Sequence, residues 1–349
     1  MIGLALLTLV PGELGGSESA TSGLLQALAR GGTLPYRVYL PPVAPDAHEG
    51  LPYDILREYR PARTIPERLI AMAIATAHPG PLRVRLRSAD VVHFPLTIRL
   101  PSVAAPSVVT LHDLQHLDLP ALFPRAERIF RAFFWHRSVR DARLVVCPSE
   151  FVRDRTSELL GIDAERVRVI PHGIDHARFT PGTTEREPFL LYPARPWPHK
   201  DHERLYDAFA LLRRERPELR LVLTGGGHSG RAPEGVDVRG AVTLDELVSL
   251  YRRAAALIFP SRYEGFGQPV LEAMACGCPV ACSDIPPLVE LAAGAARTFP
   301  PGDAAAMASA VRDVLADPEP FGERGLARAA AFTWERAAAQ YEDVYRELL

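Results

Sequence analysis

The sequence contains no asparagine, and Lys200 is the only lysine among its 40 basic residues. The four cysteines are too few and too clustered for a disulfide framework, and they match no zinc-binding spacing. We therefore expect reduced thiols and a cytoplasmic protein. No stretch approaches the roughly 20 apolar residues that a membrane-spanning helix needs. The apolar start of the chain lacks the basic region of a signal peptide, so Ile2–Val10 is predicted to be a buried strand.

The bulk composition is that of an ordinary globular protein. The chain has 349 residues, enough for two domains, with 47% hydrophobic and 23% charged residues. Its net charge of −2 gives no reason to expect a nucleic-acid partner. Residues 1–180 hold 21 basic and 18 acidic residues, a balance of +3, so the remainder carries −5.

One stretch organises the rest, Ser261–Gly277. A short apolar run of strand length precedes it, and another follows it. Gly265 and Gly267 allow the chain to turn between them, because glycine adopts conformations that are closed to other residues. Pro269 suits the first turn of a helix, and Gly277 suits its end. The pattern predicts a strand, a glycine loop, a short helix and a second strand.

The charged residues of this stretch indicate a binding site. A helix N-terminus that follows a glycine loop presents free backbone N–H groups to an anion. Glu264 stands at the loop entrance and Glu272 is expected in the first turn of the helix, where carboxylates can accept hydrogen bonds from sugar hydroxyls. The alternative is an ordinary crossover with two solvated glutamates. The glycines, Pro269 and both strands together favour the binding site.

The two glutamates spaced by seven residues around E-G-F-G, with the C-P-V strand after them, resemble the signature of the retaining glycosyltransferases of family 4. A looser similarity covers nearly the whole chain. The resemblance implies the α/β architecture called GT-B, in which two Rossmann-like, doubly wound domains face a cleft and the last helix crosses back to the first domain. Because residues 178–188 have linker composition, we place the domains at 1–180 plus 334–349 and at 181–333. Residues 41–63, rich in proline and charge, are expected to form a loop or a poorly regular crossover.

Arg195 and Lys200 have the spacing of the arginine and lysine that bind the donor diphosphate in this family. Two solvated surface cations are the alternative. The position of the only lysine in the chain favours the functional interpretation, since a compact ammonium and a guanidinium are not interchangeable.

The resemblance also implies roles for the remaining donor-side residues. Glu272 is expected to bind the ribose, and Glu264 with the loop Gly265, Phe266 and Gly267 the donor sugar. The backbone near Val242 is expected to meet the base. Gly16 follows the first strand and precedes a predicted helix, Ser17–Arg30, so the glycine pair is either a phosphate cradle or a plain tight turn.

His112 follows the predicted strand Ser107–Thr110 in the sequence H-D-L-Q-H. Two histidines spaced by four imitate a zinc-protease motif, which requires a helix to bring both to one face. Here the segment leaves a strand and soon meets Pro120, so no metal site is expected. Family 4 enzymes often carry H-D-L at this strand end, where ligands of open α/β sheets bind, and His112 is therefore a candidate catalytic residue.

A second glycine-rich segment, Gly225–Gly230, matches the G-x-G-x-x-G of dinucleotide-binding folds and follows a predicted strand. The helix that this motif requires does not follow, because Pro233 and Gly235 interrupt the chain. We therefore expect a glycine loop rather than a dehydrogenase site.

Residues 124–142 are predicted to form a basic helix with five arginines and four large aromatic side chains. The aromatic residues either pack in the first domain or, together with the arginines, dock on an anionic membrane. The second interpretation adds a peripheral membrane contact to the expected cytoplasmic location.

The function implied by the resemblance is metal-independent transfer of a hexose, with retention, from a nucleoside-diphosphate sugar to a hydroxyl of a glycan, lipid-linked or small-molecule acceptor. No Asp-x-Asp, the metal-binding motif of the other glycosyltransferase fold, occurs in the sequence. The segments H-D-L-Q-H-L and P-W-P-H-K resemble those of polysaccharide-assembling and mannosyl-transferring subfamilies. GDP-mannose is therefore the first donor to test, and UDP sugars are the next. The alternatives are a nucleotide-sugar 2-epimerase and a non-catalytic nucleotide-sugar-binding protein. The sequence predicts no oligomeric state.

Overall fold

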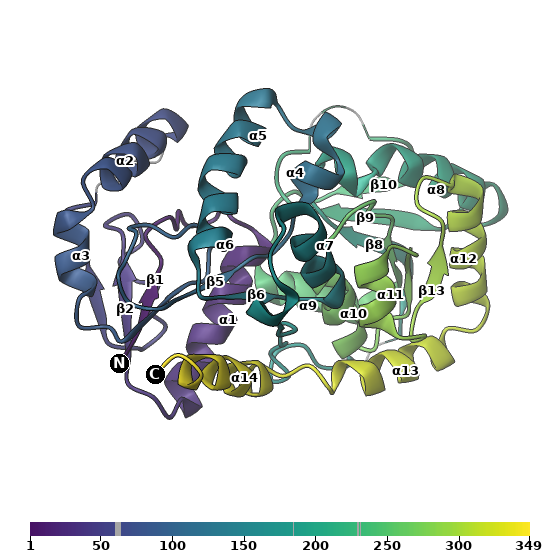
Figure 1. The fold of residues 1–349 in the computed structure, drawn as a ribbon. Helices are drawn as coiled ribbons and strands as arrows, with labels where there is room; N and C mark the ends of the chain where they lie inside the picture. The colour runs from purple at the N-terminus through teal and green to yellow at the C-terminus, as the bar shows by residue number, and fades with distance from the viewer. Residues whose placement is uncertain (60–63, 184, 229, 231) are drawn as a thin grey trace. The chain divides into compact units, whose positions relative to one another are not determined.

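The computed structural model describes residues 1–59, 64–183, 185–228, 230 and 232–349. The chain divides into two compact units, Met1–Gly173 with Trp334–Leu349, and Ile174–Thr333 (Figure 1). The first unit ends at Gly173 rather than at residue 180, where we expected the border. The reason is that Ile174 and Phe179 are buried in the core of the second unit, and Ile174 also pairs with Thr333.

Seven parallel strands form the sheet of the first unit, in the order β3-β2-β1-β4-β5-β6-β7. This doubly wound order confirms the predicted fold class. The strand bounds are β1 Ile2–Ala5, β2 Tyr36–Leu40, β3 Tyr53–Ile55, β4 Val91–Phe94, β5 Ser107–Thr110, β6 Leu144–Cys147 and β7 Val167–Val169.

Helices cover both faces of this sheet, and each face has its own apolar cluster (Figure 1). Strands buried on both faces read as continuous apolar runs, which is why β4, β5 and β6 were visible in the sequence. The helices of the first unit are α1 Gly16–Gly31, α2 Ile65–Ala77, α3 Gly80–Leu86, α4 Gln115–Asp118, η1 Pro120–Leu122, α5 Arg125–Arg131, η2 Ala132–His136, α6 Arg137–Asp141, α7 Glu150–Leu160, η3 Ala164–Arg166 and α14 Trp334–Arg346.

One prediction for the first unit was wrong. The first strand ends at Ala5 instead of Val10, because the chain turns and the Leu9 N–H donates to the Leu6 carbonyl at 2.9 Å. Residues 60–63 lie outside the described residues. In the rest of the segment 41–63 only β3 is regular, which agrees with the poorly regular crossover and not with a loop throughout. That edge strand is exposed or half-buried along its length, so it shows no apolar run in the sequence.

The second unit repeats the plan with six parallel strands in the order β10-β9-β8-β11-β12-β13. Its strands are β8 Glu187–Pro193, β9 Arg220–Thr224, β10 Val236–Val238, β11 Ala254–Phe259, β12 Val280–Ser283 and β13 Arg297–Phe299. Its helices are η4 Pro198–Lys200, α8 His202–Glu215, α9 Leu244–Arg253, α10 Gln268–Ala275, α11 Pro286–Ala292, α12 Ala304–Ala316 and α13 Glu319–Ala329. In both units, the loops that follow the strands meet at one edge of the sheet, because the strands are parallel.

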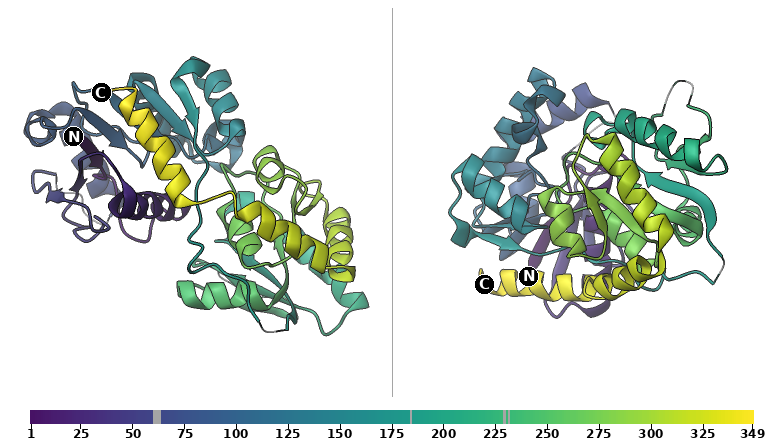
Figure 2. Two further views of the ribbon diagram at one scale, coloured as in Figure 1. Left: turned by 90° about the horizontal axis from the view of Figure 1, so that it is seen from below. Right: turned by 90° about the vertical axis from the view of Figure 1, so that its right-hand side faces the viewer.

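The last helix, α14, belongs to the first unit and packs against α1 (Figure 2). Trp334 lies so close to α1 that a Cβ atom on Gly23 would collide with the indole ring. No helix in the described part of the chain is long and apolar enough to cross a membrane.

Glu342 fastens α14 to the start of β2. Its carboxylate is 5% exposed and accepts hydrogen bonds from the Thr33 N–H at 2.5 Å, the Thr33 hydroxyl at 2.7 Å and the Tyr36 hydroxyl at 2.5 Å. Arg346, one turn along α14, pairs with it at 2.8 Å. Burial alone would raise the pKa of Glu342, but the hydrogen bonds from Tyr36 and Thr33 outweigh it and lower the pKa from 4.5 to about 2.

We expect Glu342→Gln to lower the free energy of unfolding of the first unit at neutral pH by about 2–3 kcal/mol, since charge-assisted hydrogen bonds to a buried group are lost. A depressed pKa stabilises the folded state above the unfolded value of 4.5 and loses that effect as the pH falls towards 2. In thermal unfolding, the difference in melting temperature between the native protein and Glu342→Gln should therefore narrow as the pH falls from about 5 to about 3.

The matched control is Glu335→Gln on the same helix, because Glu335 is 67% exposed and its ion pair with Arg30 is solvated. Equal melting temperatures for the two variants at neutral pH would show that Glu342 does not anchor the helix.

Candidate active site

The stretch around residues 261–277 folds as the sequence predicts. β11 leads into a loop, α10 begins at Gln268 with Pro269 in its first turn, and β12 follows Gly277. Gly267 has φ of 104°, and a Cβ atom there would collide with the Leu288 side chain, so only glycine fits. Glu272 lies in the second turn of α10, not in the first, because the helix starts at Gln268.

Lys200 and Glu264 form a nearly buried ion pair that joins two loops. The Lys200 ammonium lies 2.5 Å from Glu264 Oε1, and the two side chains are 11% and 13% exposed. Lys200 comes from η4, after β8, and Glu264 from the loop after β11. Because β8 and β11 are adjacent parallel strands, both loops lie at the same sheet edge. The structure thus brings together two residues that the sequence linked only through the family resemblance.

The backbone holds Lys200 in place on both sides. The Lys200 N–H donates to the Trp197 carbonyl at 2.8 Å, and the buried Tyr192 hydroxyl donates to the Lys200 carbonyl at 2.7 Å. The ammonium also lies 5.1 Å from the centre of the Phe259 ring. A cation fixed in this way is preorganised, which is how fixed charge acts on a bound anion.

Arg195 lies between β8 and Lys200, half-buried, with its guanidinium 5.8 Å from the centre of the Trp197 ring. The glycine loop after β9 packs against the same segment, since a Cβ on Gly225 would meet the Ala194 carbonyl carbon at 2.9 Å. Among the described residues between Gly227 and β10 no helix occurs, which agrees with a glycine loop rather than a dinucleotide fingerprint. Ser229 and Arg231 lie outside the described residues.

Glu272 is held by a residue that the sequence did not indicate. The hydroxyl of Tyr251, in α9, donates to Glu272 Oε2 at 2.8 Å. Burial raises the pKa of Glu272 from 4.5 to about 7, and the Tyr251 hydrogen bond opposes that rise. With Oε2 oriented by Tyr251, the carboxylate retains acceptor capacity on Oε1. No spacing rule could find Tyr251, because it lies on a different helix.

The other residues that were predicted to bind the donor follow strands at the same edge of the second sheet. Val242 is half-buried in the loop after β10, directly before Thr243, whose hydroxyl caps α9. Phe266 is 6% exposed and packs on Phe332 in the core, with the ring centres 6.0 Å apart. Phe266 thus packs the loop against the core, and any contact that Phe266 makes with a sugar stays a prediction. Gly265 lies between Glu264 and Phe266 in this loop.

In the first unit, His112 stands after β5, at the edge where the strands end. Its Nε2 lies 2.8 Å from the Pro95 carbonyl, which can only accept, so Nε2 carries the proton and Nδ1 a lone pair. Among the described residues, Nδ1 is buried without a hydrogen-bond partner. Burial lowers the pKa of His112, which keeps the ring neutral. The side chain is therefore prepared to accept a hydrogen bond through Nδ1.

Gly16 is the first residue of α1, after β1, and it is exposed. Gly15, directly before it, has φ of 57° and ψ of −126°, a conformation suited to glycine. The Glu18 carboxylate accepts from the Gly12 N–H at 3.0 Å, so an acidic side chain closes this turn. The geometry fits the tight turn, and a phosphate contact at Gly16 stays a prediction.

The two histidines of H-D-L-Q-H have separate surroundings. His116 lies in the four-residue helix α4, and its Nε2 is 2.9 Å from His136 Nε2 in η2. His112 precedes that helix, so no helical face carries both. Within the described residues, no three His, Cys, Asp or Glu side chains are grouped as metal ligands.

The basic segment 124–142 forms one helical path, α5-η2-α6, with a π-helical turn at residues 132–136. Phe130, Phe134 and Trp135 pack against the core, whereas Ile129 and Phe133 are 60% and 50% exposed. We expected the four aromatic side chains to behave alike, either all packed or all facing outwards. Instead three of them pack and only Phe133 is exposed.

Arg131 faces inwards and not outwards. Its guanidinium lies 4.3 Å from the centre of the Trp135 ring and pairs with Glu127 at 2.7 Å. It also lies 3.9 Å from Asp113, next to His112. Arg131 therefore connects the basic helix to the loop that carries His112.

Comparisons with known proteins agree with this architecture. Residues 14–178 match the model described as Glycosyltransferase Family 4, and residues 174–328 match Glycosyl transferases group 1. O-antigen chain mannosyltransferase B of Escherichia coli is 28% identical over 307 residues, which cover 80% of this chain and 81% of that protein.

Solved structures show the same fold. Sucrose-phosphate synthase from Thermosynechococcus elongatus superposes with a TM-score of 0.80 at 22% identity, over 99% of this chain and 98% of that one. The Anabaena protein HepE, in complex with UDP and glucose, superposes with a TM-score of 0.74 at 17% identity, over 99% of both chains. Since the two family models together span residues 14–328 and divide where the two units divide, this chain belongs to the family 4-type glycosyltransferases of GT-B architecture.

Proposed function

We propose that the protein transfers a hexosyl group, with retention and without a metal ion, from a nucleoside-diphosphate sugar to a hydroxyl of a glycan or lipid-linked acceptor. The observation that carries the proposal is the Lys200–Glu264 ion pair, 2.5 Å long and nearly buried, on the sheet edge that also carries Arg195. Glu272, which Tyr251 holds, lies in the second turn of α10, the helix that leaves this edge. This edge offers fixed cations for a diphosphate and carboxylates for hydroxyl groups.

Each group has a distinct task. Lys200 and Arg195 bind the diphosphate. Glu272 accepts hydrogen bonds from the ribose hydroxyls, and Glu264 accepts hydrogen bonds from the donor sugar. His112 accepts a hydrogen bond from a sugar hydroxyl through Nδ1. In the transfer, the bond between the anomeric carbon and the diphosphate oxygen breaks, and the diphosphate keeps the electron pair. The acceptor oxygen bonds to the same face of that carbon, and its proton passes to a donor phosphate oxygen. Fixed positive charge at the leaving group lowers the barrier of this step.

Donor identity is proposed from two likenesses. The Escherichia coli relative is named for O-antigen mannosyl transfer, and the HepE structure holds UDP and glucose. GDP-mannose is therefore the first donor to assay, and UDP-glucose the second. Incubation of donor without acceptor separates the alternatives, because a transferase leaves the sugar unchanged or hydrolyses it slowly, an epimerase converts it, and a binding protein gives no product even with acceptor.

Lys200→Ala should lower the turnover rate by about 10²–10³-fold, as expected when a preorganised charge at a leaving group is lost. The substitution also leaves the Glu264 carboxylate nearly buried and unpaired, which destabilises the fold. The double variant Lys200→Ala/Glu264→Ala is the matched control. It should recover the melting temperature and stay inactive. Near-normal turnover of Lys200→Ala at saturating donor would remove Lys200 from the mechanism.

Nucleotide affinity should depend on the charge of Glu272. Its raised pKa of about 7 means that the carboxyl is protonated below neutral pH and ionised above it. Ionised carboxylate is the better acceptor for ribose hydroxyls, so affinity for the nucleoside diphosphate should rise through about pH 7 and level off above about pH 8. Calorimetric titrations from about pH 5.5 to about pH 8.5 measure this rise.

The reference for that titration is Glu272→Gln, which keeps the ionisation of the nucleotide phosphates but not that of the side chain. Tyr251→Phe should shift the midpoint upwards, because the Tyr251 hydrogen bond lowers the pKa of Glu272. Parallel pH curves for the native protein and Glu272→Gln would contradict the ribose assignment.

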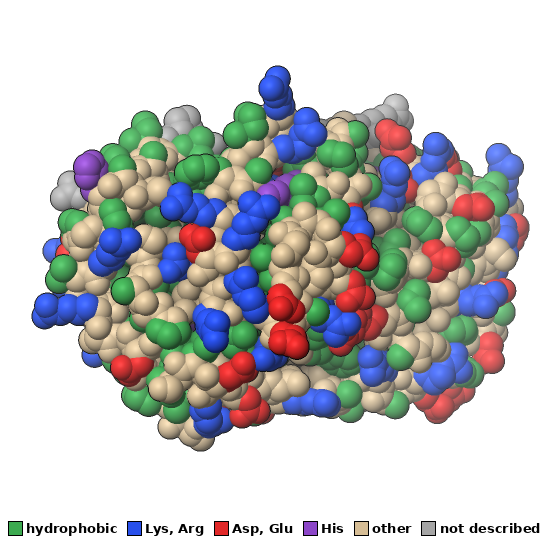
Figure 3. All heavy atoms as spheres, viewed as in Figure 1, with side chains coloured by type: hydrophobic (Ala, Val, Ile, Leu, Met, Phe, Trp, Pro, Cys, Tyr) green, Lys and Arg blue, Asp and Glu red, His purple; other side chains and the backbone are tan. Residues whose placement is uncertain are grey.

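A lipid-linked acceptor is proposed from the outer face of the helical path α5-η2-α6. Its exposed centre is Ile129 and Phe133, and exposed arginines flank this centre on both sides: Arg125, Arg128, Arg137 and Arg140. Figure 3 shows Lys and Arg side chains along the strip that α5 and α6 occupy in Figure 1. An apolar centre between cations suits an anionic membrane surface, where each cation contributes about 1 kcal/mol.

The native protein should sediment with anionic vesicles at low salt, and Ile129→Ser/Phe133→Ser should reduce the bound fraction severalfold. Arg214→Gln/Arg216→Gln, on exposed arginines at the end of α8 in the second unit, tests whether the overall charge of the protein accounts for the binding, and it should leave the bound fraction unchanged. If the native protein stays in the supernatant at low salt, the face does not bind membranes and a water-soluble acceptor is favoured.

A further inference from the structure

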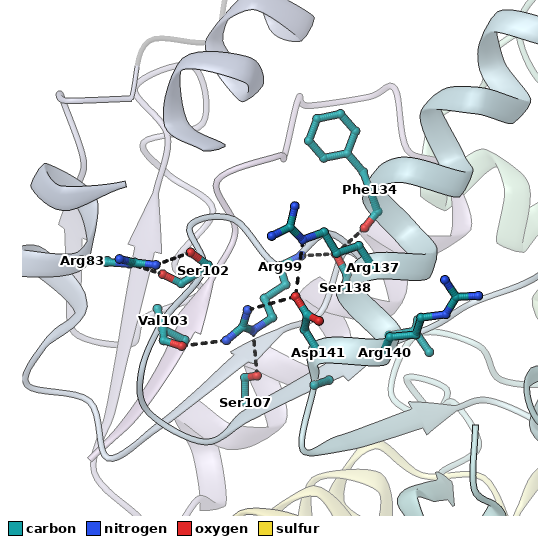
Figure 4. Close-up of polar contacts among 12 residues, drawn as sticks. Arg83, Arg99, Ser102, Val103, Ser107, Phe134, Arg137, Ser138, Arg140 and Asp141 are labelled. Atoms are coloured by element: carbon teal, nitrogen blue, oxygen red, sulfur yellow. Dashed lines mark hydrogen bonds and ion pairs between the residues drawn. The ribbon is translucent and has the colours of Figure 1, made fainter. Parts of the chain in front are cut away.

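A cavity of about 400 Å³ opens at the edge of the first sheet where β5 and β6 begin. Its walls include Arg143 and Arg166, together with four residues that Figure 4 labels: Arg99, Ser107, Arg140 and Asp141. Ser107 is the first residue of β5, and His112 follows the other end of the same strand. The cavity thus lies at the opposite edge of the first sheet from His112, and its size is in the range of small-ligand sites.

The charge of this cavity is unbalanced. Four arginines line it, with Asp141 as the single carboxylate. Asp141 already serves two cations, since its Oδ2 lies 3.9 Å from Arg99 and 3.5 Å from Arg137. Among the described residues, neither the Arg140 nor the Arg143 side chain has a hydrogen bond or an ion pair. Like charges held together in a concave site repel one another, and a bound anion would relieve that repulsion.

Two of the arginines are fixed by the backbone. Arg99 is 12% exposed, and it donates from Nε to the Ser107 hydroxyl at 3.0 Å and from Nη2 to the Val103 carbonyl at 2.7 Å. Arg166 donates to the Arg140 carbonyl at 2.9 Å, at the end of α6. Burial lowers the pKa of Arg99, Asp141 opposes that effect, and the neighbouring Arg83 and Arg137 lower the pKa further.

The other two arginines are mobile by position. Arg140 and Arg143 are exposed, and in Figure 4 the Arg140 guanidinium extends away from Arg99. Exposed side chains change rotamer within nanoseconds, so both arginine side chains can close over an anion that enters the cavity. Guanidinium groups match phosphate oxygens in pairs of hydrogen bonds.

We propose that this cavity is a second anion site, which takes a phosphate group between fixed Arg99 and Arg166 and mobile Arg140 and Arg143. The phosphate comes either from a soluble phosphate or diphosphate, or from a lipid headgroup. The site shares Arg140 with the proposed membrane face, but it uses none of the residues of the candidate active site and so does not rest on the proposed transfer reaction.

The experiment is a calorimetric titration of the full chain with inorganic pyrophosphate. The native protein should show two classes of site, one at Arg195 and Lys200 and one in this cavity. Arg140→Gln/Arg143→Gln should weaken only the second, by roughly tenfold or more. The control Arg214→Gln/Arg216→Gln carries the same change in net charge and should leave both classes unaltered. Lys200→Ala/Glu264→Ala should alter only the first class, so failure of the proposed function and failure of this site give different results.

Hydrogen-exchange mass spectrometry locates the second class. Pyrophosphate should slow exchange in residues 102–107 and 137–143 of the native protein, and not in the Arg140→Gln/Arg143→Gln variant. Vesicles of phosphatidylglycerol, compared with phosphatidylcholine, separate the sources. Protection of residues 102–107, which lie outside the α5-η2-α6 face, by the anionic vesicles identifies a headgroup, and protection by pyrophosphate alone identifies a soluble ligand. Unchanged exchange in both segments with every probe, or equal weakening in the control variant, overturns the proposal.

Discussion

The ion pair between Lys200 and Glu264 is the interaction on which the candidate active site depends. It joins the loop after β8 to the loop after β11, and both side chains are nearly withdrawn from water. A buried pair is rarely a net source of stability, but the loss of one partner leaves an uncompensated charge and is strongly destabilising. The two loops are therefore constrained to keep each other in place, and the cation stays where a diphosphate can use it.

The second constraint is the parallel arrangement of both sheets. Parallel strands bring their carboxyl ends to one edge, so residues far apart in sequence become neighbours there. Arg195, Gly225, Val242 and Glu264 all follow strands of the second sheet, and His112 follows a strand of the first. The opposite edge of the first sheet is free of these groups, and the arginine-lined cavity occupies part of it.

Much of this could be predicted from the sequence, and the failures have physical causes. Strands buried on both faces, and the glycine loop with its helix, have local signals in the chain. The edge strand β3 lacks such a signal because it is largely exposed. The Tyr251–Glu272 hydrogen bond and the inward orientation of Arg131 depend on which helices meet, and residue spacing does not encode that. The domain border was misplaced because Phe179 lies in a stretch of linker composition and is nevertheless buried.

The same geometry explains why this arginine-rich chain retains a lysine at position 200. The ammonium occupies a site that is 11% exposed, between the Glu264 carboxylate and the face of Phe259. A guanidinium has five N–H donors in a planar fork, and most of them would be left unpaired in that space. Unpaired buried donors are costly, whereas an ammonium needs only three partners and can rotate to share them between Glu264 and a ligand. Elsewhere in the described structure the other cationic side chains are arginines, which pair with carboxylates or backbone carbonyls, stack on rings or face solvent. At this position, compactness and not charge alone decides which residue fits.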